Sequence, residues 1–168
     1  MFHLLLLDID GVMTDGTKLY DANHRCIGKS FCDKDFTAIK RFKAAGIQVA
    51  FLTGDTDFNA GMAKTRNIRL FDARTLCENL KKEQALPYIR RFYGVTNKEI
   101  CYVGDDYYDV GILNEIGYAY VPANSCMDIT SLVNCCYRLK TKGGEGVIDE
   151  IYSIFKSQLK EQYPDDNL

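Results

Sequence analysis

The sequence predicts an α/β fold, a doubly wound parallel sheet, from three observations. Short apolar runs alternate with longer segments of helical periodicity, which is the pattern that repeated βα units produce. Three of these runs end in acidic residues, and in open parallel sheets ligands bind beyond the carboxyl ends of the strands. The chain has 168 residues, which is enough for one hydrophobic core but too short for two full-sized domains. We therefore expect one domain over residues 1–168.

The expected strands are short apolar runs. Leu4–Leu7 consists of leucine alone, as in a strand that is buried on both faces of a sheet. Further strands of this kind are expected at residues 47–52, 100–103 and 118–121, with a weaker one at 69–71.

Helices are expected between these strands. Residues 36–43 have helical spacing, with Asp35 as the N-cap and Gly46 as the stop signal. A longer helical pattern over residues 77–93 contains Pro87, which either kinks the helix or begins a new one.

Three further segments complete the expected organisation. Residues 96–99 match a capping box that closes one short turn before a strand. The last helix begins near Gly146 and runs to about Tyr163, and it leads into a polar tail that ends at residue 168. Residues 17–32 interrupt the alternation directly after the first strand, and their turn-like centre predicts an inserted β-hairpin.

Charge and composition exclude several classes of protein. With 21 basic and 23 acidic residues, the chain has no excess of positive charge that would indicate a nucleic-acid partner. The run Leu4–Leu7 is far shorter than the ~20 residues of a membrane-spanning helix, and no basic segment precedes it as in a signal peptide. We therefore expect a cytoplasmic protein that acts without nucleic acid or membrane.

The reactive side chains must come from outside the cysteine and histidine sets. Seven cysteines without metal-site or disulfide spacing are interpreted mostly as small core residues in a reducing compartment. Two histidines, His3 and His24, offer little to a Cys–His or Ser–His–Asp mechanism. Carboxylates, lysines and backbone groups remain for the chemistry.

Carboxylates gather where the expected strands end. Asp8 and Asp10 follow the first strand, Asp55 follows the strand at 47–52, and Asp105 with Asp106 follows the strand at 100–103. A single Asp at such a place often only caps the next helix, but capping requires one member of each pair. Several carboxylates at one sheet edge repel one another, and a hard divalent cation such as Mg²⁺ relieves the repulsion. The pattern predicts a Mg²⁺ site.

The same edge offers the groups of a phosphate site. In an extended backbone Asp8 and Asp10 point the same way, so one can attack phosphorus while the other protonates the leaving oxygen. Thr53 supplies a hydroxyl, and the backbone N–H of Gly54 supplies a second donor at a helix start. The cations available are Lys81 and Lys82, for which two solvated lysines are the alternative interpretation.

These motifs, in this order, resemble the haloacid dehalogenase (HAD) superfamily of phosphotransferases. The segment 8–12 reads Asp-Ile-Asp-Gly-Val, Thr53 and Gly54 follow the second strand, and the segment 104–106 reads Gly-Asp-Asp with Asp109 beyond it. The segment 10–16 before a hairpin, and the glycine-rich segment 142–147, look like the capless branch that dephosphorylates 3-deoxy-octulosonate (KDO) 8-phosphate or nonulosonate 9-phosphates.

The resemblance implies a role for each matching residue. Asp8 would be the nucleophile that forms an aspartyl-phosphate, and Asp10 would be the general acid and then the base that activates water. Thr53, Gly54 and Lys82 would bind the phosphate. Lys82 is chosen over Lys81 because the lysine of the family stands about twenty residues before the Val-Gly-Asp-Asp strand.

The resemblance also implies a metal site and an assembly. Mg²⁺ would be bound by Asp8, the backbone carbonyl of Asp10 and Asp105, with Asp106 in support. The hairpins of the family assemble a homotetramer, and a glycine-rich tail from a neighbouring subunit helps to close the active site, as a capless enzyme requires to exclude water. The candidate substrate or lid residues are accordingly Asp55, Lys142, Gly143, Gly144 and Glu145.

Two departures from the family pattern concern the substrate. KDO 8-phosphate phosphatases usually carry Arg at the position of Asp55, and residues 35–38 are bulkier than the small residues found there in the family. An acidic residue at position 55, together with the segment 143–146, is more like the 2-keto-3-deoxynononate (KDN) 9-phosphate phosphatases. An acidic Asp55 is expected to meet sugar hydroxyls, which slightly favours a nonulosonate 9-phosphate over KDO 8-phosphate.

Three alternatives are weighed against a sugar-acid phosphatase. A non-catalytic oligomerisation module, related to the C-terminal domain of CMP-sialate synthetases, would commonly have lost motif carboxylates that this chain retains. A response-regulator receiver shares acidic strand ends but has no use for Asp10 and Gly11 before a hairpin. A haloacid dehalogenase proper lacks the second Asp of the first motif.

Overall fold

A parallel sheet of six strands forms the centre of the computed structural model, which describes residues 1–126 and 129–162. The strands lie side by side in the order β5-β4-β1-β6-β7-β8. This confirms the doubly wound α/β fold, and the short last strand is an addition that the sequence pattern did not predict. The strand bounds are β1 Leu4–Leu7, β4 Gln48–Thr53, β5 Arg69–Asp72, β6 Ile100–Val103, β7 Tyr118–Val121 and β8 Tyr137–Arg138.

Strand β1 occupies the middle of the sheet and is buried on both faces, as its leucine run predicts. Leu5 is in register with Val49 of β4 on one side and with Cys101 of β6 on the other. Because side chains alternate along a strand, Leu5 and Leu7 enter one hydrophobic core, whereas Leu4 and Leu6 enter the core on the opposite face.

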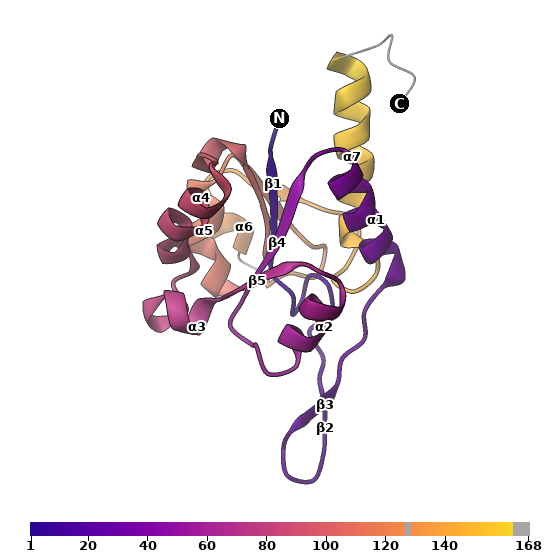
Figure 1. The fold of residues 1–168 in the computed structure, drawn as a ribbon, viewed down its shortest axis with the longest axis vertical. Coiled ribbons are helices and arrows are strands. Elements are labelled where there is room, and N and C mark those ends of the chain that lie inside the picture. Colours follow the sequence, from indigo (N-terminus) through magenta and orange to yellow (C-terminus); the bar gives the residue numbers. More distant parts are fainter. Residues whose placement is uncertain (127–128, 163–168) are drawn as a thin grey trace.

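Two groups of helices cover these faces (Figure 1). Helices α1 and α7 pack on one side, where Phe42 and Phe155 meet in the aromatic part of the core. Helices α3, α4 and α5 lie on the other side with Ile89 and Leu113 in the second core. The helix bounds are α1 Asp33–Ala44, α2 Asn59–Thr65, α3 Ala73–Leu76, α4 Leu86–Tyr93, α5 Val110–Glu115, α6 Ile129–Leu132 and α7 Val147–Gln162, with 3₁₀ turns at η1 Glu78–Leu80, η2 Lys82–Ala85, η3 Asn97–Glu99 and η4 Tyr107–Asp109.

The expected hairpin is present and projects from the body of the molecule beyond the carboxyl ends of the strands (Figure 1). It pairs β2 (Leu19–Tyr20) with β3 (Cys26–Gly28) in antiparallel fashion. The paired part is shorter than the expected segment 17–32, and a register shift between Leu19 and Tyr20 lies within it.

One capping assignment from the sequence is wrong. Helix α1 begins at Asp33 with Cys32 as its N-cap, so Asp35 lies inside the first turn. Its Oδ1 accepts hydrogen bonds from the backbone N–H groups of Ile148 at 2.7 Å and Asp149 at 3.3 Å. The carboxylate thus supplies the cap of α7, a helix that is distant in sequence and adjacent in space.

The other local expectations have clear outcomes. Pro87 begins a new helix, because α4 starts at Leu86 with this proline in its first turn, where the missing N–H costs nothing. The capping box at residues 96–99 is confirmed, with both reciprocal hydrogen bonds present. Of the seven free cysteines, Cys77 and Cys101 are buried in the cores, and Cys126 and Cys136 are partly buried against one of them, so four of the seven agree with their interpretation as core residues.

Helix α7 follows the predicted last helix, and the expected tail after residue 162 lies outside the described residues. Within the described ranges, no helix is both long enough and apolar enough to span a bilayer.

Candidate active site

A cavity of about 300 Å³ opens at the carboxyl edge of the sheet. Eight of the residues singled out from the sequence line it together: Asp8, Asp10, Thr53, Gly54, Asp55, Lys82, Asp105 and Asp106. The lining is completed by Gly11, Gly16, Lys18, Leu80, Tyr108 and Asp109.

We define the floor of the cavity as Asp8, Lys82, Asp105 and Asp109. The buried ammonium group of Lys82 joins two of its carboxylates. The Lys82 ammonium donates to Asp8 Oδ2 at 2.6 Å and to Asp109 Oδ1 at 2.7 Å. The 3₁₀ turn η2 directs Lys82 inward, whereas its neighbour Lys81 is exposed. The structure therefore separates two lysines that composition alone does not distinguish.

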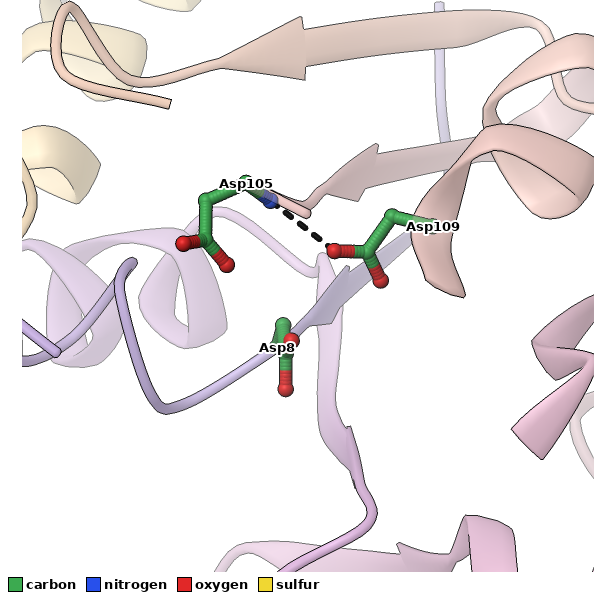
Figure 2. Close-up of side chains that lie close together, drawn as sticks. All are labelled: Asp8, Asp105 and Asp109. Atoms are coloured by element: carbon green, nitrogen blue, oxygen red, sulfur yellow. Dashed lines mark hydrogen bonds between the residues drawn. The ribbon is translucent and has the colours of Figure 1, made fainter. Parts of the chain in front are cut away.

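Three carboxylates of the floor converge on one point (Figure 2). Asp8, Asp105 and Asp109 each offer an oxygen atom, and these atoms all lie within 4.8 Å of one another. Asp8 follows β1, whereas Asp105 and Asp109 belong to the segment after β6. The in-register pairing of β1 with β6 brings the two strand ends together.

Asp109 holds the floor in shape. Its Oδ2 accepts the backbone N–H groups of Asp105 at 2.9 Å and Asp106 at 3.1 Å (the first of these is dashed in Figure 2). Its Oδ1 accepts the hydroxyl of Tyr102 at 2.7 Å in addition to the Lys82 ammonium. Since both oxygens are engaged, Asp109 orients the groups around it.

Gly11 permits the close approach of Asp105. The residue has φ +83°, and a Cβ at this position would overlap the Asp105 carboxylate. Only glycine therefore allows the loop after Asp10 to turn over the floor.

The floor carries more negative charge than Lys82 can balance. Burial raises the pKa of Asp8 to about 7, although Lys82 acts in the opposite direction. Burial, with the added repulsion of Asp8 and Asp109, raises the pKa of Asp105 to about 8. Burial alone would lower the pKa of Lys82, but the carboxylates of Asp109 and Asp8 outweigh it and raise that pKa.

This floor fits a hard divalent cation. The atoms that its three carboxylates offer to a metal are all oxygens, and they converge within a few ångströms. A cation among them would offset the repulsion between the carboxylates. Asp8 and Asp105 are the side chains that would hold the ion, since Asp109 already accepts four hydrogen bonds.

Asp106 has a different place from its neighbour Asp105. Its carboxylate accepts the backbone N–H of Tyr107 at 2.6 Å and caps the 3₁₀ turn η4. The capping alternative thus describes Asp106, while Asp105 faces the other carboxylates.

The opposite side of the cavity, which we call the hairpin wall, consists of Asp10, Lys18, Lys29, Asp55 and Asn59. Lys29 has a fully buried side chain, and its ammonium lies 2.7 Å from Asp10 Oδ1, 3.0 Å from Asp55 Oδ2 and 3.1 Å from Asn59 Oδ1. Asn59 donates to Asp10 Oδ2 at 3.2 Å. Asp10 is thereby held by Lys29 and Asn59, which both follow it in the sequence, 19 and 49 positions later.

Asp55 lines the cavity and is also paired within its own chain. Its Oδ2 forms ion pairs with Lys18 and Lys29, both from the hairpin. Burial opposes ionisation, but these two lysines outweigh it and lower the pKa of Asp55. The acidic residue at this position is thus neutralised within the chain.

The glycine-rich segment does not line the cavity of its own chain. Gly144 donates its N–H to the carbonyl of Val12 at 3.0 Å, and a Cβ on Gly143 would overlap the carbonyl oxygen of Gly11. The two glycines therefore support the loop after β1 from behind. Lys142 and Glu145, which flank them, are also absent from the lining.

The sequence reasoning missed Lys18, Lys29 and Asn59, and it gave no role to Asp109. A signal existed for Asp109, because it follows the Gly-Asp-Asp motif at capping-box spacing from Asp106. The hairpin lysines carry no such signal, since lysines in a polar hairpin are ordinarily solvated.

The fold and this floor define the class of protein: a phosphatase of the HAD superfamily. No family model matches the chain. The 3-deoxy-D-manno-octulosonate 8-phosphate phosphatase KdsC of Haemophilus influenzae is 34% identical over 148 residues, which cover 88% of this chain and 78% of that protein. The chain therefore belongs to the family of KDO 8-phosphate phosphatases.

Solved structures agree with this assignment. The cobalt-bound form of the deoxy-D-mannose-octulosonate 8-phosphate phosphatase from Haemophilus influenzae is 32% identical, with a TM-score of 0.81 over 98% of this chain and 94% of that one. The KDO 8-phosphate phosphatase from Moraxella catarrhalis, solved with magnesium ion, phosphate ion and KDO, shares the fold at 24% identity, with a TM-score of 0.81 over 96% of this chain and 90% of that one.

Proposed function

We propose that this protein is a Mg²⁺-dependent phosphatase that removes the terminal phosphate from KDO 8-phosphate. The observation that carries the proposal is the placement of Asp8 in the cavity floor, held by Lys82 and facing Asp105. Membership of the family supports the substrate, because the relative with 34% identity is named for this reaction.

The reaction that we propose proceeds in two displacements. A carboxylate oxygen of Asp8 attacks phosphorus, the bond between phosphorus and the sugar oxygen breaks, and Asp10 donates a proton to that oxygen. Asp10 then removes a proton from water, which attacks the aspartyl-phosphate and releases inorganic phosphate with Asp8 regenerated. Lys82 and Thr53, both buried at the cavity, would bind the phosphate oxygens and offset their charge.

Mg²⁺, held by the side chains of Asp8 and Asp105 and by the backbone carbonyl of Asp10, would neutralise charge on the transferring phosphoryl group. Gly54 lies beside Thr53 in the lining and offers its backbone N–H to the same group. Asp106, as the cap of η4, supports the segment that presents Asp105.

A nonulosonate 9-phosphate such as KDN 9-phosphate is the second candidate substrate. The segment 143–146 favours it, but the argument from Asp55 is weakened because Lys18 and Lys29 neutralise that carboxylate. We therefore place KDO 8-phosphate first.

We also propose that the protein forms a homotetramer through its hairpin. Leu19 and Ile27 on the two hairpin strands are 63% and 56% exposed. Exposed apolar side chains gathered on a projecting element are typical of an interaction surface. A neighbouring subunit docked there could bring its residues 142–145 toward the cavity.

The decisive test is phosphate release from KDO 8-phosphate, KDN 9-phosphate and N-acetylneuraminate 9-phosphate, measured with Mg²⁺ and with EDTA. We expect Mg²⁺-dependent release that is fastest for KDO 8-phosphate. Asp8→Asn keeps the shape but removes the nucleophile, so it should lower kcat by about 10⁴-fold or more. Failure to release phosphate from any of the three would contradict the proposal and favour a non-catalytic oligomerisation module.

A further inference from the structure

A second cavity of about 550 Å³ adjoins the active site. The two cavities share Lys18 and Asp55 in their linings, so this ion pair forms the partition between them. The outer cavity is enclosed by the hairpin on one side and by the segments that carry Phe58 and Arg74 on the other. Its volume lies well within the range of small-molecule sites, whereas the inner cavity, at about 300 Å³, lies at the lower end of that range.

The outer cavity carries positive charge that the protein does not neutralise. Lys18 is paired with Asp55, but the guanidinium groups of Arg25 and Arg74 have no ion-pair partner among the described residues. Asp57 is the one other acidic residue in this lining. Two guanidinium groups therefore stand against one carboxylate at the rim of the active site, which favours an anionic ligand.

One wall of the outer cavity is flat. Tyr20 and His24 stack with their ring centroids 4.5 Å apart and an interplanar angle of 5°. His24 has φ +59°, a conformation that the hairpin turn imposes and that presents its ring to Tyr20. Together with Phe58 these rings give the cavity an apolar surface beside its charged one, which suits a ligand with a carbon skeleton and an anionic end.

The chemistry of the proposed substrate matches this arrangement. An octulosonate 8-phosphate carries its phosphate on the last carbon of an eight-carbon chain and its carboxylate on the first. With the phosphate over Asp8 and Lys82, the carboxylate lies at the far end of the molecule, and the outer cavity adjoins the inner one across the Lys18–Asp55 ion pair.

We propose that the outer cavity binds the carboxylate end of the substrate, and that Arg25 and Arg74 are its specificity-determining residues. This inference rests on the proposed function, because it concerns the same substrate at the same site. A planar guanidinium can bind a carboxylate through two parallel hydrogen bonds, and a phosphate ester without a carboxylate cannot form these bonds when its phosphate lies over Asp8.

The test compares a substrate with a carboxylate to one without it. Arg25→Ala, Arg74→Ala and Arg74→Lys are assayed on KDO 8-phosphate and on p-nitrophenyl phosphate, with Arg91→Ala on the exposed surface of α4 as the matched control. We expect Arg74→Ala and Arg25→Ala to raise KM for KDO 8-phosphate by about tenfold to a hundredfold with kcat within about twofold. Arg74→Lys should lie between, and the aryl ester should be hydrolysed as by the unsubstituted protein.

A second measurement keeps this inference separate from the substrate assignment. Free KDO carries the carboxylate but no phosphate, so it should inhibit p-nitrophenyl phosphate hydrolysis, and Arg74→Ala should weaken that inhibition about tenfold or more. No inhibition by KDO, or equal inhibition of the two proteins, overturns the carboxylate subsite. Inhibition that depends on Arg74, in a protein that fails to hydrolyse KDO 8-phosphate, would support the subsite and overturn the proposed function.

Discussion

The floor and the hairpin wall of the active site are built in different ways. The floor carboxylates lie at the ends of β1 and β6, where parallel pairing fixes their separation, and Lys82 beneath them is only 4% exposed. The wall depends on Lys18 and Lys29, which reach in from an inserted hairpin. Sheet topology thus positions Asp8 and Asp105, the proposed nucleophile and metal ligands, whereas the inserted hairpin holds Asp10, the proposed proton donor.

The largest loss of stability and activity should come from removing the ammonium group of Lys82 from the floor. Lys82→Met leaves the buried carboxylates of Asp8 and Asp109 without their cationic partner, which should cost about 3–5 kcal/mol of unfolding free energy. Loss of a preorganised cation at the phosphate should also lower kcat by about 10²–10³-fold. Urea unfolding and phosphate release measure the two effects.

The exposed neighbour provides the control for this substitution. Lys81→Met changes the same residue type one position earlier and should leave stability and turnover unchanged. Equal losses in the two variants would mean that the contacts of Lys82 with the floor do not matter.

The next effect should come from breaking the wall at Lys29. Lys29→Met removes the closest contact of Asp10 and so disturbs proton donation to the leaving group. The rate of hydrolysis of an alkyl phosphate such as KDO 8-phosphate should therefore fall by about 10²-fold. Hydrolysis of p-nitrophenyl phosphate should fall much less, because p-nitrophenolate departs without a proton.

The ratio of the two rates is the critical readout for Lys29. Loss of activity by the same factor on both esters would indicate a structural defect and would contradict a positioning role for this lysine. Asn59→Ala, which removes the second contact of Asp10, should change the ratio in the same direction by a smaller factor.

A smaller effect, on Mg²⁺ binding, is expected from a substitution at Gly11, which lies between the floor and the hairpin wall. Gly11→Ala would drive a Cβ into the Asp105 carboxylate and impose strain at φ +83°. Displacing a ligand in this way should weaken Mg²⁺ binding by about tenfold to a hundredfold. The midpoint of a Mg²⁺ titration of activity measures it, with Gly61→Ala as control because its Cβ would meet open space. An unchanged midpoint would show that Asp105 does not depend on Gly11.

The smallest effect, on stability alone, is expected from removing the hydrogen bonds between Asp35 and the start of α7. Asp35→Ala leaves the N–H groups of Ile148 and Asp149 without their acceptor and should cost about 1–3 kcal/mol. Asp35→Asn keeps an acceptor oxygen and should cost less. Urea unfolding of both variants against the unsubstituted protein measures the difference.

The same residue should give the protein a pH-dependent stability. Burial raises the pKa of Asp35 from 3.8 to about 6, so between these values the folded chain binds more protons than the unfolded one. Its contribution is therefore most favourable below about pH 4 and is lost as the pH rises through about 6. Asp35→Asn should remove this part of the slope, and an unchanged slope would exclude Asp35 as its source.

The floor was largely predictable because its signals are local. A leucine run followed by Asp-Ile-Asp-Gly, and a second strand followed by Gly-Asp-Asp, place carboxylates at one sheet edge once the strands are known to be parallel. The choice of Lys82 needed the family spacing, since burial of one lysine and exposure of its neighbour are decided by the turn η2.

The hairpin wall was not predictable in the same way. The prediction that Asp55 meets sugar hydroxyls considered the residue alone, and it did not include the two hairpin lysines that contact its Oδ2. The assignment of Asp35 as the N-cap of α1 was wrong for a related reason, because its carboxylate caps α7 and not the helix in which it lies. Side chains that act across long sequence separations leave no trace in local pattern.

The contacts behind the loop after β1 also set an order of assembly. Gly144 supports Val12, and the hydrogen bond from Ile148 to Asp35 joins residues that are 113 positions apart. Closing such a loop is entropically costly and comes late in folding. During synthesis β1 and Asp8 are made early, but the loop that carries Asp10 gains its support only when Gly144 and the start of α7 are made. A chain that stopped before Gly144 would contain Asp8, Asp10, Lys82 and Asp105 but would lack the hydrogen bond that supports Val12.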